Sequence, residues 1–383
     1  MFHGWYNDIM NSTIRDVIII IAAVLFSTIL LYLPFATHSL EYLGFDEPGG
    51  MNTIIQNYDG LYYIVPAMSG YNPKAIEAIR LEFAIPLEYY ASHLPLYPLF
   101  IAAFAPIFGY VYSMLVVNVL FTAALAVGFY YILKALQITK YPVALVLVFL
   151  FLPRFFIIRS VGAPESLFIL CIIASIYFFE KQHYLYAGLL GAAAAMTKSP
   201  GILLFGAYGL VFIERLISGK SFEWKWLWIT LIPVGLLSVF TLYLIQYNDF
   251  FAYFHTGGVV PMPYPFAAFN HTAKWVDTVW LEDILLYFFI YLYAVVKLAS
   301  FKYRSMFYFS AIFFLSAIFV QHRDLSRYLL PIWPFTAIAY ETFLTSKTFR
   351  MVLIFLLPAI FLYAINFLQQ NVIPVSDWRP FIY

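Results

Sequence analysis

Long apolar runs follow one another through most of this 383-residue chain, and several approach or exceed the length needed to cross a lipid bilayer. Hydrophobic residues make up 63% of the sequence and charged residues only 11%. A soluble protein of this size could not bury that much apolar surface. Barrel strands would alternate in polarity, and these runs do not. The sequence therefore predicts an all-α polytopic membrane protein.

The polar connections between these runs predict how the chain crosses the membrane. Four short connections are rich in Lys and Arg, which favours the cytoplasmic side. They lie around Lys134 and Lys140, at 215–225, at 297–304 and at 347–350. The apolar runs cover 16–35, 95–109, 110–133, 141–158, 165–179, 184–197, 201–213, 227–247, 284–296, 305–320, 327–344 and 351–368.

All four basic connections and the N-terminus share the cytoplasmic side only if run 95–109 does not cross fully. Its sequence, PLYPLFIAAFAPIFG, is short, holds three prolines and ends in Gly. We expect a re-entrant or interfacial hairpin whose backbone is buried in protein. The first run, 16–35, is too long for a typical signal peptide and is expected to be an uncleaved anchor. The prediction is eleven full crossings plus one partial crossing, with the C-terminus outside.

Two long loops, 36–94 and 248–283, fall on the predicted outer face together with most of the twenty acidic residues. Loops longer than about 15 residues in a compact fold are usually functional. We therefore place the active site on the extracytoplasmic face of a single domain, 1–383. The net charge of +1 argues against a nucleic-acid surface. Cys171 is the one cysteine, so an intrachain disulfide is excluded. No metal-ligand or nucleotide-binding motif is present, so neither a metal nor a cofactor is predicted.

Asp59 stands out in the first outer loop, within NYDGLYYIVPAMSGY. A carboxylate shielded by aromatic rings can act as a general base and accept a proton from a sugar hydroxyl. A solvated loop residue or a helix N-cap is the alternative. The Gly70-Tyr71 pair is expected to end a short helix. Asp46 and Glu47, in GFDEPGG, suit a turn but could also bind a cation or act as the base.

Basic side chains recur at predicted outer helix ends, where cations usually have an anionic ligand or an ion-pair partner. A lipid phosphate at the bilayer edge is such a ligand, because Arg and Lys bind phosphate oxygens well. Snorkelling to headgroups, or pairing with Glu165 and Asp324, is the alternative. The candidate cations are Arg154, Arg159, Lys198, His322, Arg323 and Arg327.

Two further features could contact a substrate on the outer face. Glu165 opens a predicted helix in GAPESLF, where it complements the helix dipole or holds a sugar or a cationic partner. The loop FHTGGVVPMPYPFAAF contains His255 and several prolines, and its aromatic rings could wall an acceptor site or form an interfacial lid. Asn270-His271-Thr272 is a glycosylation sequon, which matters only in a host that glycosylates.

Taken in order, these motifs resemble a known family. The aromatic-Asp pair is followed by HLPLYPLF, PESLF, TKSPGILL and SRYLLPIWPF. This order is similar to that of the PIG-V-like family, typified by the transferase that adds the second mannose of GPI anchors. That family is a branch of the GT-C membrane glycosyltransferases. The resemblance covers nearly the whole chain, and its strength lies in the order of motifs that are individually weak.

The resemblance implies a GT-C-like bundle and inverting transfer of a sugar, usually mannose, from a polyprenyl-phosphate donor to a glycan or glycolipid acceptor. The family's base lies in a Trp-Asp pair of the first outer loop, and Asp59 in Tyr-Asp matches it. Lys198 matches a position where Thr-Arg-Ser is common. The Trp that follows NDFFAYFHTGG in the family is missing, so the acceptor is not identified. The donor-phosphate candidates are Lys198, Arg323, Arg327 and Arg159, and the substrate-binding candidates are Tyr58, Tyr71, His93, Glu165, His255 and His322.

Two other classes of protein fit part of this pattern. A transporter or lipid flippase would also place charged residues in a helical bundle, but it predicts polar groups at mid-membrane and often internal repeats. Here the ionisable residues cluster at outer helix ends and no repeat is evident. A polysaccharide ligase or polymerase-like enzyme would use outer Arg and His residues without needing an Asp in the first loop.

Overall fold

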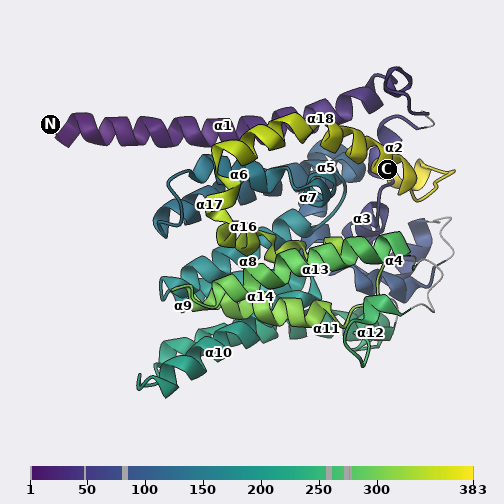
Figure 1. Ribbon diagram of the computed structural model, residues 1–383. Helices are drawn as coiled ribbons and strands as arrows, with labels where there is room; N and C mark the ends of the chain where they lie inside the picture. The colour runs from purple at the N-terminus through teal and green to yellow at the C-terminus, as the bar shows by residue number, and fades with distance from the viewer. Residues whose placement is uncertain are drawn as a thin grey trace.

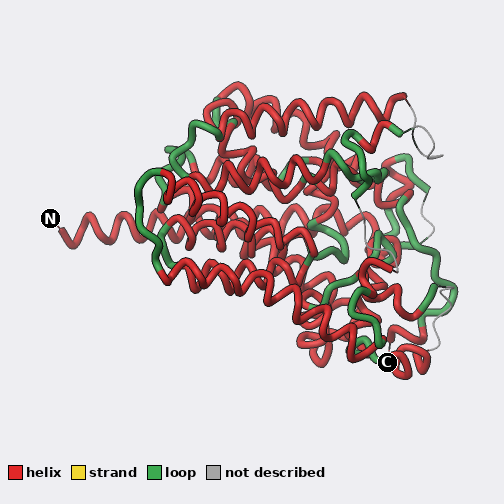
Figure 2. Tube along the Cα trace, turned by 90° about the horizontal axis from the view of Figure 1, so that it is seen from below, coloured by secondary structure: helices red, strands yellow, loops and turns green. Residues whose placement is uncertain are grey.

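The computed structural model describes residues 2–46, 49–79, 85–255, 261–270, 276 and 278–382. Within these ranges the regular elements are α-helices and short 3-10 helices (Figure 2). An isolated antiparallel bridge between Asn57 and Val372 is the only β pairing in them. The all-helical prediction is therefore confirmed for the described part of the chain.

Six helical stretches are long and apolar enough to cross a membrane, so the chain is an integral membrane protein. Several of them run across the molecule in roughly one direction (Figure 1). Their outer faces expose large apolar side chains, such as Ile354 and Phe355 in the last one. The six stretches are Ser12–Ala36 in α1 (Phe2–Ala36), Leu96–Ala135 (α5), Ser199–Ile217 (η3, Ser199–Ile202, then α10, Leu203–Ile217), Trp224–Tyr247 (η4, Trp224–Thr230, then α11, Leu231–Tyr247), Val279–Leu298 in α13 (Thr278–Leu298) and Lys347–Gln370 (α18).

The other predicted runs form shorter helices, so eleven full crossings stay a prediction. Run 141–158 is divided before Pro153, because a proline lacks the N–H that would continue the helix. Run 327–344 is divided into four short pieces, two of which contain proline near their start. The shorter elements are α6 (Pro142–Leu150), α7 (Pro153–Ile158), α8 (Glu165–Glu180), α9 (Tyr184–Thr197), α14 (Arg304–Ala317), α15 (Leu325–Tyr328), η6 (Leu330–Ile332), α16 (Trp333–Ala339) and α17 (Glu341–Leu344).

Helix α5 joins the predicted partial crossing to the next run across a sharp bend. Gly109 has φ 71° and ψ 159°, a conformation that only glycine adopts readily. The Tyr97 hydroxyl donates to the Met114 carbonyl at 2.9 Å. The rings of Phe100 and Phe121 lie 4.8 Å apart. A straight helix would separate these pairs by about 25–32 Å, so the two arms fold back on each other at Gly109. The bend lies at the end of run 95–109 and not within it, and a partial crossing by this run stays a prediction.

The first long loop is built of short helices and packs against the bundle. Leu61, Ile64 and Val65 are fully buried, and all three lie on α3. In Figure 1, α2, α3, α4 and α12 gather at one end of the molecule, away from the N-terminus. The short elements of the two long loops and the C-terminus are η1 (Leu40–Leu43), α2 (Met51–Ile55), α3 (Gly60–Ser69), α4 (Pro73–Ile79), η2 (Leu87–Ser92), α12 (Ala252–His255), η5 (Ala267–Phe269) and α19 (Arg379–Ile382).

Small residues let α9 approach η4 and α11 closely, as is typical of helices that pack within membranes. A Cβ added at Gly188 would lie 2.1 Å from the Trp228 carbonyl oxygen. One added at Gly191 would lie 2.6 Å from Ile232, and one at Gly235 2.8 Å from the Cβ of Ala192. The glycines therefore set the spacing between these helices, one of which lines the site described below.

We expect Gly188→Ala to destabilise the protein, because the backbone of η4 must move to admit the methyl group. Overpacking of this kind costs about 1–3 kcal/mol. The apparent melting temperature of the purified protein measures it. Gly209→Ala is the matched control, since a Cβ on this glycine of α10 meets nothing within 4 Å and alanine is the better helix former. Equal melting temperatures for the two variants would contradict the close packing of α9 on η4.

Candidate functional site

Asp59 lies at the N-cap position of α3, directly before Gly60. Its side chain makes no capping hydrogen bond, and 43% of it is exposed. The preceding Tyr58 has φ 52°, a left-handed conformation that costs a non-glycine residue about 1–2 kcal/mol. Helix α3 ends at Ser69 with Gly70 at φ 58°, as the sequence predicts. The backbone at the start of α3 thus sets the position of Asp59, and its carboxylate does not cap the helix.

Two cations beside Asp59 share one buried carboxylate. Arg327 donates from Nε to Glu165 Oε1 at 2.7 Å, and Lys198 donates from Nζ to the same oxygen at 2.7 Å. Glu165 is fully buried at the first position of α8. A guanidinium nitrogen of Arg327 also lies 3.9 Å from Asp59 Oδ2. Glu165 therefore fixes two cations from distant parts of the chain next to the candidate base.

A second ion pair, between Arg154 and Asp324, lies beside this cluster and contacts Tyr58. Arg154, at the start of α7, donates to the Tyr58 hydroxyl and to Ser326 Oγ, both at 2.9 Å. It also lies 3.3 Å from an oxygen of Asp324. The guanidinium of Arg327 sits over the Tyr58 ring, 4.4 Å from its centre, in cation–π geometry. Arg154 thus orients Tyr58, and Tyr58 supports Arg327.

Two histidines add polar groups that carry no charge at neutral pH. Burial lowers the pKa of His93 to about 4, although the negative charge of Asp59 acts in the opposite direction. Burial also lowers the pKa of His322, against the charge of Asp324. The Asp324 backbone N–H donates to His322 Nδ1 at 3.0 Å, so the neutral ring carries its proton on Nε2. The positive charge of the site therefore comes from Lys198 and Arg327.

These side chains meet at a cavity of about 440 Å³ that is lined by both polar and apolar side chains. Its ionisable lining includes Asp59, His93, Lys198, His322 and Arg327. Part of its apolar lining comes from α10, α11 and α14, and the first two belong to membrane-length stretches. The apolar lining includes Ile202, Leu203, Leu236, Phe240, Phe254, Phe313, Ala317 and Val320. The cavity thus offers cations to an anionic group and apolar side chains to an apolar group of the same ligand.

Comparison with protein-family models found no match for this chain. Comparison with curated protein sequences found none either. The site must therefore be interpreted from its own geometry and chemistry.

Several residues that the sequence analysis selected do not line this cavity. Arg159 is fully buried elsewhere and donates to Ser27 Oγ at 2.8 Å and to the Leu150 carbonyl at 3.2 Å. Arg323 is exposed, and its carbonyl accepts from the Trp280 indole. Both were proposed as phosphate ligands because of their positions at outer helix ends. Position alone does not show which way a long side chain points, and here the two lie outside the cavity.

The remaining substrate candidates are also placed differently from one another. Tyr58 contacts Arg327 without lining the cavity, and Tyr71 is buried and donates to the His93 carbonyl. His255 is exposed and pairs with Asp249 at 2.7 Å. Glu165 has no exposed surface, so it holds cations and does not reach a sugar in the cavity. Asp46 is exposed and outside the cavity, and Glu47 lies outside the described residues.

Other lining residues were missed by the sequence analysis. They are tyrosines and serines. Tyr63, Ser199 and Tyr328 lie within the quoted motifs, but no sequence pattern was a reason to select them, and only the fold brings the set to the cavity. Arg154 was noted as a cation but was not selected, and its position beside a helix-starting proline was the one available signal. The missed lining tyrosines and serines are Tyr63, Tyr89, Ser92, Ser199, Tyr253, Ser316 and Tyr328.

Proposed function

We propose that this protein is an inverting membrane glycosyltransferase that uses a polyprenyl-phosphate-linked sugar as donor. The observation that carries the proposal is the mixed lining of one cavity, which combines Asp59, Lys198 and Arg327 with apolar side chains of α10, α11 and α14. A lipid-linked phosphosugar combines the same two kinds of group. Its phosphate matches the two cations, and its apolar chain matches the apolar side chains.

The proposed reaction uses each charged group once. An acceptor hydroxyl attacks the anomeric carbon of the donor sugar, and Asp59 takes the hydroxyl proton. The bond between that carbon and the phosphate oxygen breaks, and the electron pair leaves with the polyprenyl phosphate. Lys198 and Arg327 stabilise the negative charge that develops on the phosphate. The configuration at the carbon inverts because attack and departure occur on opposite faces.

The finer parts of the proposal rest on the sequence. The order of motifs favours mannose as the sugar, a glycan or glycolipid as the acceptor and a GT-C-like arrangement of eleven crossings. The basic connections favour an extracytoplasmic location for Asp59. One element of the structure supports this orientation, because the bend at Gly109 is compatible with a run 95–109 that crosses the membrane only in part.

The proposal is tested by supplying polyprenyl-phosphate mannose and polyprenyl-phosphate glucose separately to the purified protein with a mixed pool of glycan and glycolipid acceptors. We expect sugar transfer from one donor, with mannose favoured, and release of polyprenyl phosphate in equal amount. Binding of a donor without any transfer would contradict the transferase and favour a lipid transporter. Transfer of a preassembled oligosaccharide alone would favour a ligase.

Donor binding gives a second readout of the same proposal. We expect Lys198→Gln to weaken donor binding by about 10- to 150-fold, which corresponds to the loss of one charge-assisted hydrogen bond. Lys220→Gln is the matched control, because this lysine follows α10 on an exposed connection and does not line the cavity. Equal donor affinity in both variants would mean that Lys198 serves only as the partner of Glu165.

A further inference from the structure

Two adjoining cavities lie at the opposite end of the molecule from the cavity at Asp59. Helix α18 connects the two ends: Asn57, near Asp59, pairs with Val372 just beyond its end, whereas Lys347 begins it. Its 24 residues span about 36 Å. A cavity of about 960 Å³ opens at Lys347 and joins a cavity of about 490 Å³ between α1, α6 and α18. The residues lining both are Asp16, Lys140, Tyr141, Pro142 and Arg350.

The larger cavity carries an excess of unpaired positive charge. Its two acids are engaged locally: Asp16 accepts from the Tyr130 hydroxyl at 2.9 Å, and Glu341 accepts from Thr139 and Thr342. Four cations line it, Lys134, Lys140, Lys347 and Arg350. In the described part of the chain none of the four forms an ion pair within 4.0 Å, and Lys134 donates to Thr13 and to the Tyr130 hydroxyl. Lys140, Lys347 and Arg350 are thus the three cations of this cavity that have neither an ion-pair partner nor such a hydrogen bond in the described part of the chain.

Two helices also begin at this cavity. Helix α6 starts at Pro142 and α18 starts at Lys347, and both residues line it. The N-terminal end of a helix carries a partial positive charge that favours an anion. The helix ends and the three cations thus act on the same space with the same sign.

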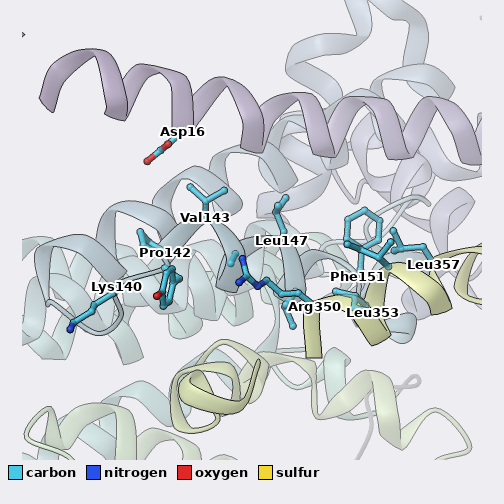
Figure 3. A pocket seen from close by; sticks show the side chains of 13 residues that line it. Asp16, Lys140, Pro142, Val143, Leu147, Phe151, Arg350, Leu353 and Leu357 are labelled. Carbon is cyan, nitrogen blue, oxygen red and sulfur yellow. The ribbon is translucent and has the colours of Figure 1, made fainter. Parts of the chain in front are cut away.

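The smaller cavity extends this basic space with an apolar groove. Figure 3 shows Asp16 and Lys140 toward one end, Arg350 between, and Phe151 and Leu357 toward the other end. Val143 and Leu147 continue the groove along α6, one turn apart. The distance from residue 143 to residue 151 is about 12 Å at the rise of a helix. A groove of this length accommodates a large part of one acyl chain.

We propose that these joined cavities bind an anionic phospholipid. Its headgroup phosphate lies among Lys140, Lys347 and Arg350, and one acyl chain lies in the groove between α6 and α18. A soluble anion would satisfy the cations but leave the groove empty, and a zwitterionic lipid would bring its own cation into a space that already holds four. The bound lipid joins α1, α6 and α18 at the membrane surface, at the end of the molecule that the basic connections place in the cytoplasm. This site is independent of the proposed transferase.

The proposal is tested on delipidated full-length protein in neutral detergent. Phosphatidylglycerol and phosphatidylcholine of the same acyl chains are titrated separately, and inorganic phosphate is the third probe. Bound lipid is counted by native mass spectrometry, and the melting temperature is followed by tryptophan fluorescence. For the unmodified protein we expect saturable binding of one phosphatidylglycerol with a rise in melting temperature. We expect at least 10-fold weaker binding of phosphatidylcholine and no effect of phosphate.

Two double variants distinguish lipid binding in the cavities from nonspecific attraction to surface charge. Lys140→Gln with Arg350→Gln removes two exposed cations and is expected to weaken phosphatidylglycerol binding by about 10-fold or more. Lys220→Gln with Lys225→Gln removes two exposed cations from another basic connection and is expected to leave binding unchanged. Equal weakening in both would overturn the site in favour of nonspecific attraction. Stabilisation of the unmodified protein by inorganic phosphate to the same extent would overturn the lipid as the ligand.

Discussion

Asp59→Asn is expected to lower the rate of sugar transfer by about 10²–10⁴-fold, the usual effect of losing a general base. Asparagine keeps the size of the side chain but does not take a proton from the acceptor hydroxyl at neutral pH. Because the carboxylate makes no capping hydrogen bond and is 43% exposed, the fold should tolerate the change. Turnover with saturating donor and donor affinity are measured together, and donor affinity should remain close to that of the unmodified protein.

The control is Asp46→Asn, which alters another acid of the first outer loop. Asp46 is exposed and does not line the cavity, so this variant should keep normal turnover. Full turnover in Asp59→Asn combined with loss in Asp46→Asn would assign the base to the wrong acid. A lower donor affinity and melting temperature in Asp59→Asn, with turnover unchanged per folded molecule, would mean that Asp59 serves only as an ion partner of Arg327.

Glu165→Gln is expected to cost about 3–5 kcal/mol of folding free energy, the typical effect of breaking a buried ion pair from one side. Lys198 and Arg327 both donate to Glu165 Oε1. With a neutral amide at position 165, the half-exposed Asp59, 3.9 Å from Arg327, would be the remaining carboxylate beside their two charges. The melting temperature and the fraction of monodisperse protein in detergent measure the loss. Donor transfer should fall with the amount of folded protein and also per folded molecule, because the cations lose their fixed positions.

Glu214→Gln provides the comparison for a surface pair. Glu214 accepts from Arg304 Nε at 3.0 Å, but both side chains are about one-third exposed. Exposed ion pairs of this kind contribute about 0–1 kcal/mol, so the melting temperature should change little. An equal fall in melting temperature in the two variants would show that burial does not make the ion pairs of Glu165 more important for stability than an exposed ion pair.

The sequence predicted the components of the site better than their contacts. Asp59 was selected for its aromatic setting in the first outer loop, and Lys198 and Arg327 were selected because cations at outer helix ends usually have an anionic ligand or an ion-pair partner. Pairing of the cations with Glu165 was one of the alternatives that the sequence left open. That Lys198 and Arg327 share one oxygen of a fully buried Glu165 was not predicted, because no sequence pattern brings these three distant segments together. Arg159 shows the opposite error. Its side chain is buried against the rings of Phe151 and Phe156 and donates to the hydroxyl of Ser27. No sequence pattern predicts these contacts.

The sequence also predicted the existence of the helices better than their interruptions. Apolar composition identifies segments that avoid water, so nearly every predicted run contains a helix. It does not show where a helix is interrupted, because prolines break run 141–158 but are tolerated within α5 and α18. The outcome depends on whether neighbouring helices can supply hydrogen bonds to the backbone groups that the proline leaves unpaired. The bend at Gly109 could be anticipated, because a glycine there follows a short run containing three prolines.

The shared carboxylate has a consequence for how charge moves through a reaction cycle. With both acids ionised, Asp59, Glu165, Lys198 and Arg327 sum to zero, and His93 is neutral at physiological pH. In the proposed reaction a donor would therefore enter a site that is neutral as a whole and polarised locally. When Asp59 takes a proton, the protein groups would become more positive by one unit, and in the same step the phosphate would become more negative by one. The total charge of the site would stay constant during transfer, so the proposed step requires no ion to enter or leave the cavity until the products leave.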